Sequence, residues 1–225
     1  MTVLLRIDAS ARLNGSITRQ MADRFINGWR TSEPNAQILS RDVGRQPPSV
    51  VSEASIRAGF TPPEQRTPDM NDALAESTTL INELRRADVL VLAAPLYNYG
   101  LPASLKAWID QIVRPGETFS FDLERGDFPI RSTLIGKSLV VLSSRGEFGF
   151  EPGGIRDGWN HLNSHLRTVA TRLLGIAPKD IYEIASEYQE FDDDRHRLSV
   201  SRAHASAQAL GERLSAQPTD LVAAG

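Results

Sequence analysis

Two patterns of apolar and polar residues alternate along the chain. Short apolar runs predict strands, and longer segments with apolar residues on one face predict amphipathic helices. The predicted strands are Val3–Asp8, Ala36–Asp42, Asp88–Ala94, Ser138–Ser144 and Asp180–Ala185. The predicted helices are Ser16–Arg30, Asp69–Arg86, Pro102–Val113, Trp159–Leu174 and Val200–Gln217. Strands that alternate with helices in this way predict an α/β fold with a doubly wound parallel sheet and right-handed crossovers.

Two segments interrupt this alternation. The segment Gly44–Asp69 is rich in Pro, Ser and Gly, and its length is typical of a functional flap. Within Gly116–Gly136, the alternating stretch Thr118–Phe121 and the turn residues Arg125–Asp127 predict a hairpin. A chain of 225 residues fits a single domain, residues 1–217, followed by a flexible C-terminal tail at 218–225.

Composition narrows the class of protein. The net charge is −3 and the basic residues are scattered, which argues against a nucleic-acid partner or an anionic membrane surface. No window approaches the ~18 apolar residues of a membrane span, so no membrane insertion is expected. Because the chain has no cysteine, any redox chemistry must use a bound organic cofactor. The first residues lead directly into a strand without a signal-peptide pattern, so a cytoplasmic location is expected.

Two clusters of metal-binding residue types carry little signal. His161 and His165 stand four positions apart on a predicted helix, but no H-E-x-x-H pattern and no third ligand accompany them. The acidic run Asp192–Asp194 is interpreted as a solvated turn. No metal site is predicted.

The most informative segment begins with the apolar run Ala87–Pro95, which is typical of a strand buried on both faces of a parallel sheet. Pro102 then starts a helix, and the loop between them provides two aromatic rings, an amide and exposed backbone donors. The loop residues of interest are Leu96, Tyr97, Asn98 and Tyr99. Open α/β sheets bind ligands at the carboxyl ends of their strands, so this loop is a candidate flavin site.

Two further loops follow predicted strands on the same side of the sheet. The first runs from Asp8 to a helix N-terminus, where the hydroxyls of Ser10, Ser16 and Thr18 and unpaired backbone N–H groups would suit a phosphate. The alternative is that Ser16 only caps the helix. No G-x-G-x-x-G follows the first strand, which argues against a classical dinucleotide site. The second loop, Ser144–Glu147, is either the far edge of the ligand site or a polar turn.

These three loops resemble the FMN-dependent NADH-azoreductase and NAD(P)H:quinone oxidoreductase family, whose fold is flavodoxin-like. The likeness extends over nearly the whole chain and is sharpest in Ser10 with Ser16–Thr18, in Pro95–Asp110 and in Ser144–Gly146. It implies strand order 2-1-3-4-5 with helices on both faces, and FMN as the cofactor. The cofactor-binding residues it implies are Ser10, Ser16, Ile17, Thr18, Leu96, Tyr97, Asn98, Tyr99, Ser144, Arg145, Gly146 and Glu147.

The chain departs from the family pattern at three of these positions. The family commonly has glycine in place of Glu147, methionine in place of Leu96 and phenylalanine in place of Tyr99. A carboxylate near the flavin edge would disfavour an anionic reduced flavin, so Glu147 bears on the flavin potential and on substrate preference.

The resemblance implies a homodimeric enzyme that takes electrons from NADH or NADPH and reduces quinones or aromatic azo compounds by a ping-pong two-electron mechanism. No side chain is assigned an acid–base role, because the flavin carries the chemistry. Tyr97, Tyr99 and Trp159 are candidates for stacking on the substrate. The alternatives are a flavodoxin-like electron carrier and a non-enzymatic flavin-binding sensor, and steady NADH oxidation with a quinone would exclude both.

The helix after the aromatic loop suggests how the dimer forms. It carries Trp108, Ile109 and Ile112, and Phe119–Phe121 adds more apolar surface than one sheet-facing stripe is expected to bury. Part of this helix is therefore predicted to contact a second copy of the chain, which would complete the mouth of the pocket. The alternative is that Trp108 belongs wholly to the core of one chain.

Overall fold

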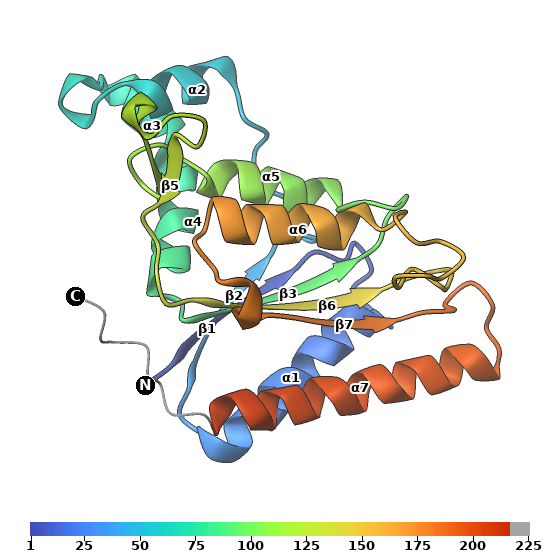
Figure 1. Ribbon diagram of the computed structural model, residues 1–225. Helices are drawn as coiled ribbons and strands as arrows, with labels where there is room; N and C mark the ends of the chain where they lie inside the picture. The colour runs from blue at the N-terminus through green and yellow to red at the C-terminus, as the bar shows by residue number, and fades with distance from the viewer. Residues whose placement is uncertain (217–225) are drawn as a thin grey trace.

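The computed structural model describes residues 1–216, and a parallel sheet forms its centre (Figure 1). The strand order is β2-β1-β3-β6-β7. The strands are β1 (Val3–Asp8), β2 (Gln37–Asp42), β3 (Val89–Pro95), β6 (Ser138–Ser144) and β7 (Ile181–Ser186). Counted along the sheet alone, this is the order 2-1-3-4-5, so the predicted flavodoxin-like topology is confirmed.

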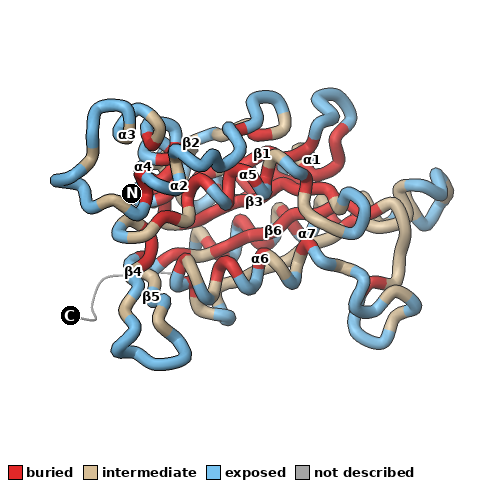
Figure 2. The backbone as a smooth tube through the Cα atoms, turned by 90° about the horizontal axis from the view of Figure 1, so that it is seen from above, coloured by how far each residue is buried: buried red, intermediate tan, exposed pale blue. Residues whose placement is uncertain are grey.

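Helices cover both faces of the sheet, as predicted (Figure 1). One face is covered by α1 (Ile17–Ser32) and α7 (Asp194–Ser215). The other is covered by α4 (Ala75–Arg86), α5 (Ala103–Ile112) and α6 (His161–Arg172). The sheet therefore separates two hydrophobic cores, and Figure 2 shows the buried residues concentrated along its strands.

The position of β3 in the middle of the sheet explains why its sequence is apolar without interruption. Successive side chains of a strand point to opposite faces, so Leu90 and Leu92 enter the core beneath α4, α5 and α6. Val89 and Val91 enter the core beneath α1 and α7. All residues of β3 are buried. A strand between two helical layers must be apolar on both faces.

The segment between β2 and α4 contains more regular structure than the sequence predicts. A capping box at Ser52 starts α2 (Glu53–Phe60), and the short 3₁₀ helix η1 (Pro63–Gln65) follows. Thr67 then caps α3 (Pro68–Ala73). The prediction of one helix over Asp69–Arg86 is wrong, because the chain forms α3 and α4 as separate helices that meet at Leu74.

Two later helices begin at positions that the sequence misplaces. Asn160 caps α6, so this helix starts two residues after the predicted Trp159. Asp193 accepts hydrogen bonds from the N–H groups of Arg195 and His196 and starts α7 six residues before the predicted Val200. The acidic run interpreted as a solvated turn is thus partly a helix cap. Gln217, the predicted end of this helix, and the tail predicted at 218–225 lie outside the described residues.

The predicted hairpin is confirmed. Its strands β4 (Phe119–Phe121) and β5 (Ile130–Ser132) pair antiparallel, and the 3₁₀ helix η2 (Leu123–Arg125) lies between them. Another short 3₁₀ helix, η3 (Pro178–Asp180), leads into β7. Within residues 1–216, no helix combines the length and the apolar character needed to cross a membrane.

The structure overturns the argument that placed part of α5 against a second copy. Trp108 is 1% exposed, Ile109 3% and Ile112 0% within a single chain. All three lie in the core shared by the sheet, α4 and α6. The sequence alone underestimates this burial because the residues that surround the helix come from elements far apart in the chain.

Two glycines allow α1 and α7 to pack closely, and this contact generates a stability prediction. A Cβ on Gly28 would lie 2.1 Å from the carbonyl oxygen of Gln208, and one on Gly211 would lie 2.1 Å from that of Phe25. We expect Gly28→Ala to lower the free energy of unfolding by about 1–3 kcal/mol, because the backbones must separate. Urea denaturation measures this change.

Gly59 in α2 provides the matched control. A Cβ there would meet its nearest heavy atom, Cγ of Arg114, at 3.8 Å, an ordinary contact. Gly59→Ala should raise the free energy of unfolding by roughly 0.4–1 kcal/mol, because the unfolded chain loses freedom. Equal effects of the two substitutions would contradict the close packing of α1 and α7.

Candidate functional site

The parallel register brings the three predicted loops to one edge of the sheet. Asp8 at the end of β1 is paired with Ala93 of β3, and Pro95 is paired with Ser144 of β6. The loops after these strands therefore leave the sheet side by side. A pocket at this edge is lined by Ser10, Arg12, Ser16, Ile17, Pro95, Tyr97, Ser144 and Gln189.

The loop after β1 forms a polar cradle at the N-terminus of α1. The side chains of Ser10, Ser16 and Thr18 are buried, and the hydroxyls of Ser16 and Thr18 lie 3.3 Å apart. Ser16 also accepts a hydrogen bond from the N–H of Arg19 at 3.5 Å, a long contact for a helix cap. The first turn of a helix has N–H groups without partners in the helix and a positive end of the dipole. The cradle therefore suits an anion.

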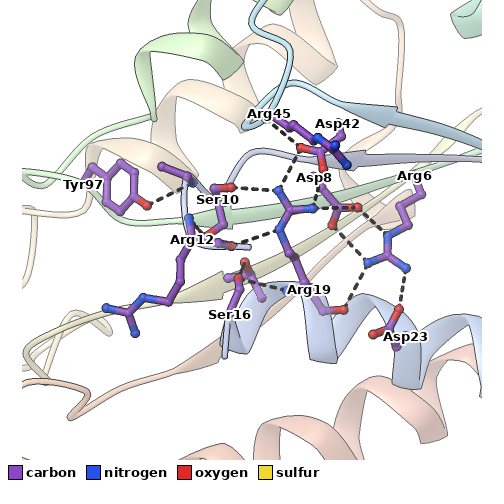
Figure 3. Close-up of polar contacts among 12 residues, drawn as sticks. Arg6, Asp8, Ser10, Arg12, Ser16, Arg19, Asp23, Asp42, Arg45 and Tyr97 are labelled. Carbon is purple, nitrogen blue, oxygen red and sulfur yellow. Dashed lines mark hydrogen bonds and ion pairs between the residues drawn. The ribbon is translucent and has the colours of Figure 1, made fainter. Parts of the chain in front are cut away.

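Arg19 fixes the shape of this cradle (Figure 3). Its guanidinium forms a bidentate pair with Asp42 at 2.7 and 2.8 Å. The same group donates to the carbonyl oxygens of Ser10 at 2.8 Å and Arg12 at 3.2 Å. One side chain thus joins the end of β2 to two points of the loop after β1. Arg19 holds the pKa of the Asp42 carboxyl below its usual range, so this pair stays ionised.

A second arginine, Arg6, partly offsets the burial of the Asp8 carboxylate at the end of β1. Burial raises the pKa of Asp8, and this effect exceeds the opposing one of Arg6, whose Nε lies 2.8 Å from the carboxylate. Gly44 packs against the same loop, where a Cβ would lie 2.2 Å from the carbonyl oxygen of Ser10. The backbone of the loop is therefore fixed both by the hydrogen bonds of Arg19 and by close packing against Gly44.

The aromatic loop makes a tight turn at the pocket. Tyr97 and Gly100 exchange backbone hydrogen bonds of 3.1 and 2.9 Å, and Asn98 and Tyr99 have φ values of 47° and 62°. Two positive φ values between such partners are the pattern of a type I′ turn. The Tyr97 hydroxyl accepts a hydrogen bond of 3.3 Å from the N–H of Ala11. This tyrosine therefore joins the aromatic loop to the loop after β1.

The third loop places its predicted residues in different environments. The Arg145 side chain is buried, pairs with Glu187 at 3.1 Å and lies over the ring of Phe150. Its backbone N–H donates to Ser186 and its carbonyl oxygen accepts from Gln189. We therefore expect Arg145 to support the loop instead of contacting a ligand.

Its neighbours Gly146 and Glu147 lie differently. The Glu147 carboxylate accepts a hydrogen bond of 2.8 Å from the Tyr99 hydroxyl and one from Arg156. Arg156 and Tyr99 lower the pKa of Glu147 below its usual range, so it is an anion at neutral pH. A Cβ on Gly146 would lie 2.3 Å from Oε1 of Glu190, so glycine leaves room for that carboxylate.

Three residues that line the pocket, Arg12, Pro95 and Gln189, are not among the cofactor-binding residues predicted from the sequence. Pro95 is the last residue of β3, directly before the predicted loop. Arg12 extends away from the ion-pair network in Figure 3 and lines the pocket beside Ser10 and Ser16. A cation among hydroxyls in a loop before a helix is a signal that could have been used. Gln189 comes from the loop after β7, and no local pattern in the sequence connects it to the other loops.

Comparison with known proteins shows the family to which the chain is related. A model of the Flavodoxin_2 family, described as having a flavodoxin-like fold, matches residues 2–209. An FMN-dependent NADH:quinone oxidoreductase 2 from Idiomarina loihiensis is 48% identical over 98% of this chain and 93% of its own length. Another with the same name, from Colwellia psychrerythraea, is 45% identical over 95% of this chain and 100% of its own.

The chain belongs to the flavodoxin-like family of FMN-dependent NADH:quinone oxidoreductases.

Solved structures share the fold of this family member. An azoreductase from Bacillus anthracis str. Sterne superposes with a TM-score of 0.82 at 19% identity, covering 95% of this chain and all of its own. An FMN-dependent NADH-azoreductase from Bacillus anthracis str. Ames Ancestor, solved in complex with FMN, gives 0.81 at 16% identity and covers 96% of this chain and 100% of its own. At these identities the likeness concerns the fold.

The contacts of Arg19 in this family member lead to a prediction about loop order. Arg19→Lys keeps the charge but cannot form the bidentate pair together with both loop contacts. We expect faster amide hydrogen exchange at residues 10–15 and a free energy of unfolding lower by about 1–3 kcal/mol. Hydrogen exchange with mass spectrometry and urea denaturation measure the two effects.

The control is Arg24→Lys on the same helix, outside the contacts with the loop after β1. Its exchange rates at residues 10–15 should match those of the parent. Unchanged exchange in Arg19→Lys would show that Arg19 does not hold the loop.

Proposed function

We propose that the protein is an FMN-dependent NAD(P)H oxidoreductase that reduces quinones, aromatic azo compounds or both. The observation that carries this proposal is one pocket, at the carboxyl edge of the sheet, lined by Ser10 and Ser16 of the cradle and by Tyr97 and Ser144. Flavodoxin-like sheets bind ligands at this switch point between β1 and β3. The names of the relatives that share 45–48% of their residues with the chain support the same activity.

The residues present fit the parts of FMN. The phosphate matches the buried hydroxyls of Ser10, Ser16 and Thr18, the first-turn N–H groups that begin at Ile17, and the cation of Arg12. The isoalloxazine matches the loop Leu96–Tyr99, whose two tyrosines are each 40% exposed. The backbone of Gly146 and Glu147 would line the far edge, while Arg145 supports that loop.

The chain supplies orientation and electrostatics. Bound FMN would supply two-electron transfer from NADH or NADPH to the acceptor. Tyr97, Tyr99 and Trp159 present partly exposed rings on which a flat substrate can stack. The donor and the acceptor would bind to these rings one after the other, as a ping-pong mechanism requires. Because NADH and NADPH are cytoplasmic reductants, we infer a cytoplasmic location.

The proposal predicts the behaviour of the purified protein. It should carry FMN, and anaerobic NADH or NADPH should bleach the flavin absorbance. Addition of a quinone should restore the absorbance, and steady-state rates should give parallel double-reciprocal lines.

Absence of FMN, or recovery of FAD in its place, would contradict the assignment of the pocket. A flavin that NADH bleaches but no quinone or azo compound reoxidises would favour an electron carrier. A flavin that neither NADH nor NADPH reduces would favour a sensor.

We also propose that the protein is a homodimer, on evidence other than α5. Large apolar side chains project from the α2 segment and from the hairpin, which Figure 1 shows at the end of the molecule opposite the strand arrowheads. They are Val50, Val51, Ile56, Phe60, Phe121, Leu123, Phe128 and Ile130. Exposed apolar groups of this extent are typical of protein interfaces. A two-fold arrangement in which the two copies lie side by side and antiparallel would bring one copy's hairpin to the pocket edge of its partner and complete the mouth of the pocket.

The dimer is tested by Ile56→Asp combined with Phe60→Asp. We expect the parent to sediment as a dimer at micromolar concentration and this variant as a monomer with reduced turnover. Charges in an apolar interface are costly to bury, which is why the variant should dissociate.

Leu198→Asp, on exposed surface of α7, is the control and should remain dimeric. A fully active monomeric parent would contradict the proposal.

A further inference from the structure

Tyr99 adopts a backbone conformation that needs support from the rest of the protein. Its φ of 62° lies in the left-handed region, which is strained for a bulky residue. Its carbonyl oxygen accepts a hydrogen bond of 2.9 Å from the N–H of His161 at the start of α6. Its ring meets Trp159 edge to face, with centroids 5.7 Å apart and an interplanar angle of 85°. Trp159 and His161 therefore hold Tyr99 in one orientation.

The hydroxyl of Tyr99 is held by a second pair of residues. It donates to Oε2 of Glu147 at 2.8 Å, and Arg156 donates to Oε1 of the same carboxylate. Arg156 is itself fixed, because its Nη1 donates to the carbonyl oxygen of Phe148 at 2.9 Å and its guanidinium lies over the Phe148 ring. Both carboxylate oxygens of Glu147 are thus engaged, one by a neutral donor and one by a cation.

This cluster lies at the mouth of the proposed acceptor site. The rings of Tyr99 and Trp159 are 40% and 51% exposed and meet almost at right angles, so together they form an aromatic corner. Glu147 cancels the charge of Arg156 beside this corner. Glu190, whose carboxylate lies against Gly146, adds a negative charge. The charges of Glu147, Arg156 and Glu190 together are therefore negative, and each ring of the corner offers a flat apolar face.

We propose that Glu147 is a specificity-determining residue that makes the site prefer flat, uncharged acceptors over anionic ones. It does so by neutralising Arg156 and by orienting the Tyr99 ring. This inference rests on the proposed function, because it concerns the acceptor of that reaction. Without Glu147, Arg156 would present an unpaired cation at the mouth and attract anionic acceptors.

The test compares an uncharged acceptor, 1,4-naphthoquinone, with an anionic one of the same ring system, 1,2-naphthoquinone-4-sulfonate. The measured quantity is the ratio of their kcat/KM values, which does not depend on how much flavin each preparation carries. In Glu147→Gln the ratio should shift by about three- to tenfold in favour of the sulfonate, the effect of one partly screened charge. The shift should shrink at 0.5 M salt, because the ions screen an exposed charge.

Two further variants separate charge from structure. In Glu147→Gln combined with Arg156→Gln the mouth is again without an unpaired cation, so the ratio should return towards that of the parent. Tyr99→Phe removes the hydrogen bond and keeps both charges. It should raise KM for both acceptors and leave the ratio within about twofold of the parent.

The outcomes also separate this inference from the proposed function. If the parent protein oxidises neither NADH nor NADPH with either quinone, the proposed function fails. If the parent turns over both quinones and Glu147→Gln leaves their ratio unchanged, Glu147 does not select the acceptor. A ratio that shifts equally in the single and double variants would show a structural effect and would also overturn the inference.

Discussion

The site depends on the contacts of one guanidinium. Arg19 of α1 pairs with Asp42 at the end of β2 and donates to the carbonyl oxygens of Ser10 and Arg12 in the loop after β1. A loop that presents hydroxyls and N–H groups to a ligand must direct its carbonyl oxygens elsewhere. Arg19 takes up two of them, and the planar arrangement of its donors fixes the direction of both. Contacts within the protein therefore hold the cradle at the helix N-terminus, and a loop held in this way costs less to order when a ligand binds.

The same principle holds for the other two loops at this edge of the sheet. Tyr97 joins the aromatic loop to the loop after β1, and Tyr99 joins it to Glu147. In the third loop, the Arg145 side chain is buried and pairs with Glu187. Each loop is thus connected to the next by a side chain, while the sheet between two hydrophobic cores sets the position of all three. Hydrogen bonds and ion pairs therefore fix the shape of the three loops, and hydrophobic packing of the sheet fixes their position.

Much of the fold could be predicted because the signals are local. The run Val89–Pro95 is apolar throughout since its residues alternate between two cores, and Ser16 precedes a helix that it caps. The residues of the candidate pocket follow strands that meet at one edge, which is a property of topology. Contacts between distant residues could not be predicted. The pairing of Arg19 with Asp42, the burial of Trp108 and the bond between Tyr99 and Glu147 depend on how separate elements pack. The early start of α7 was not predicted because an aspartate such as Asp193 is common both in turns and at helix caps.

The central claim is that the loop after β1 holds the phosphate of FMN. Titration of the apoprotein with FMN and with riboflavin, followed by flavin fluorescence, tests it most directly because the two ligands differ only in that phosphate. The account predicts that FMN binds at least about 100-fold more tightly, the effect of two or more charge-assisted hydrogen bonds. It also predicts that the combined variant Ser16→Ala and Thr18→Ala loses most of this difference. Equal affinities of the parent protein for FMN and riboflavin would contradict the account.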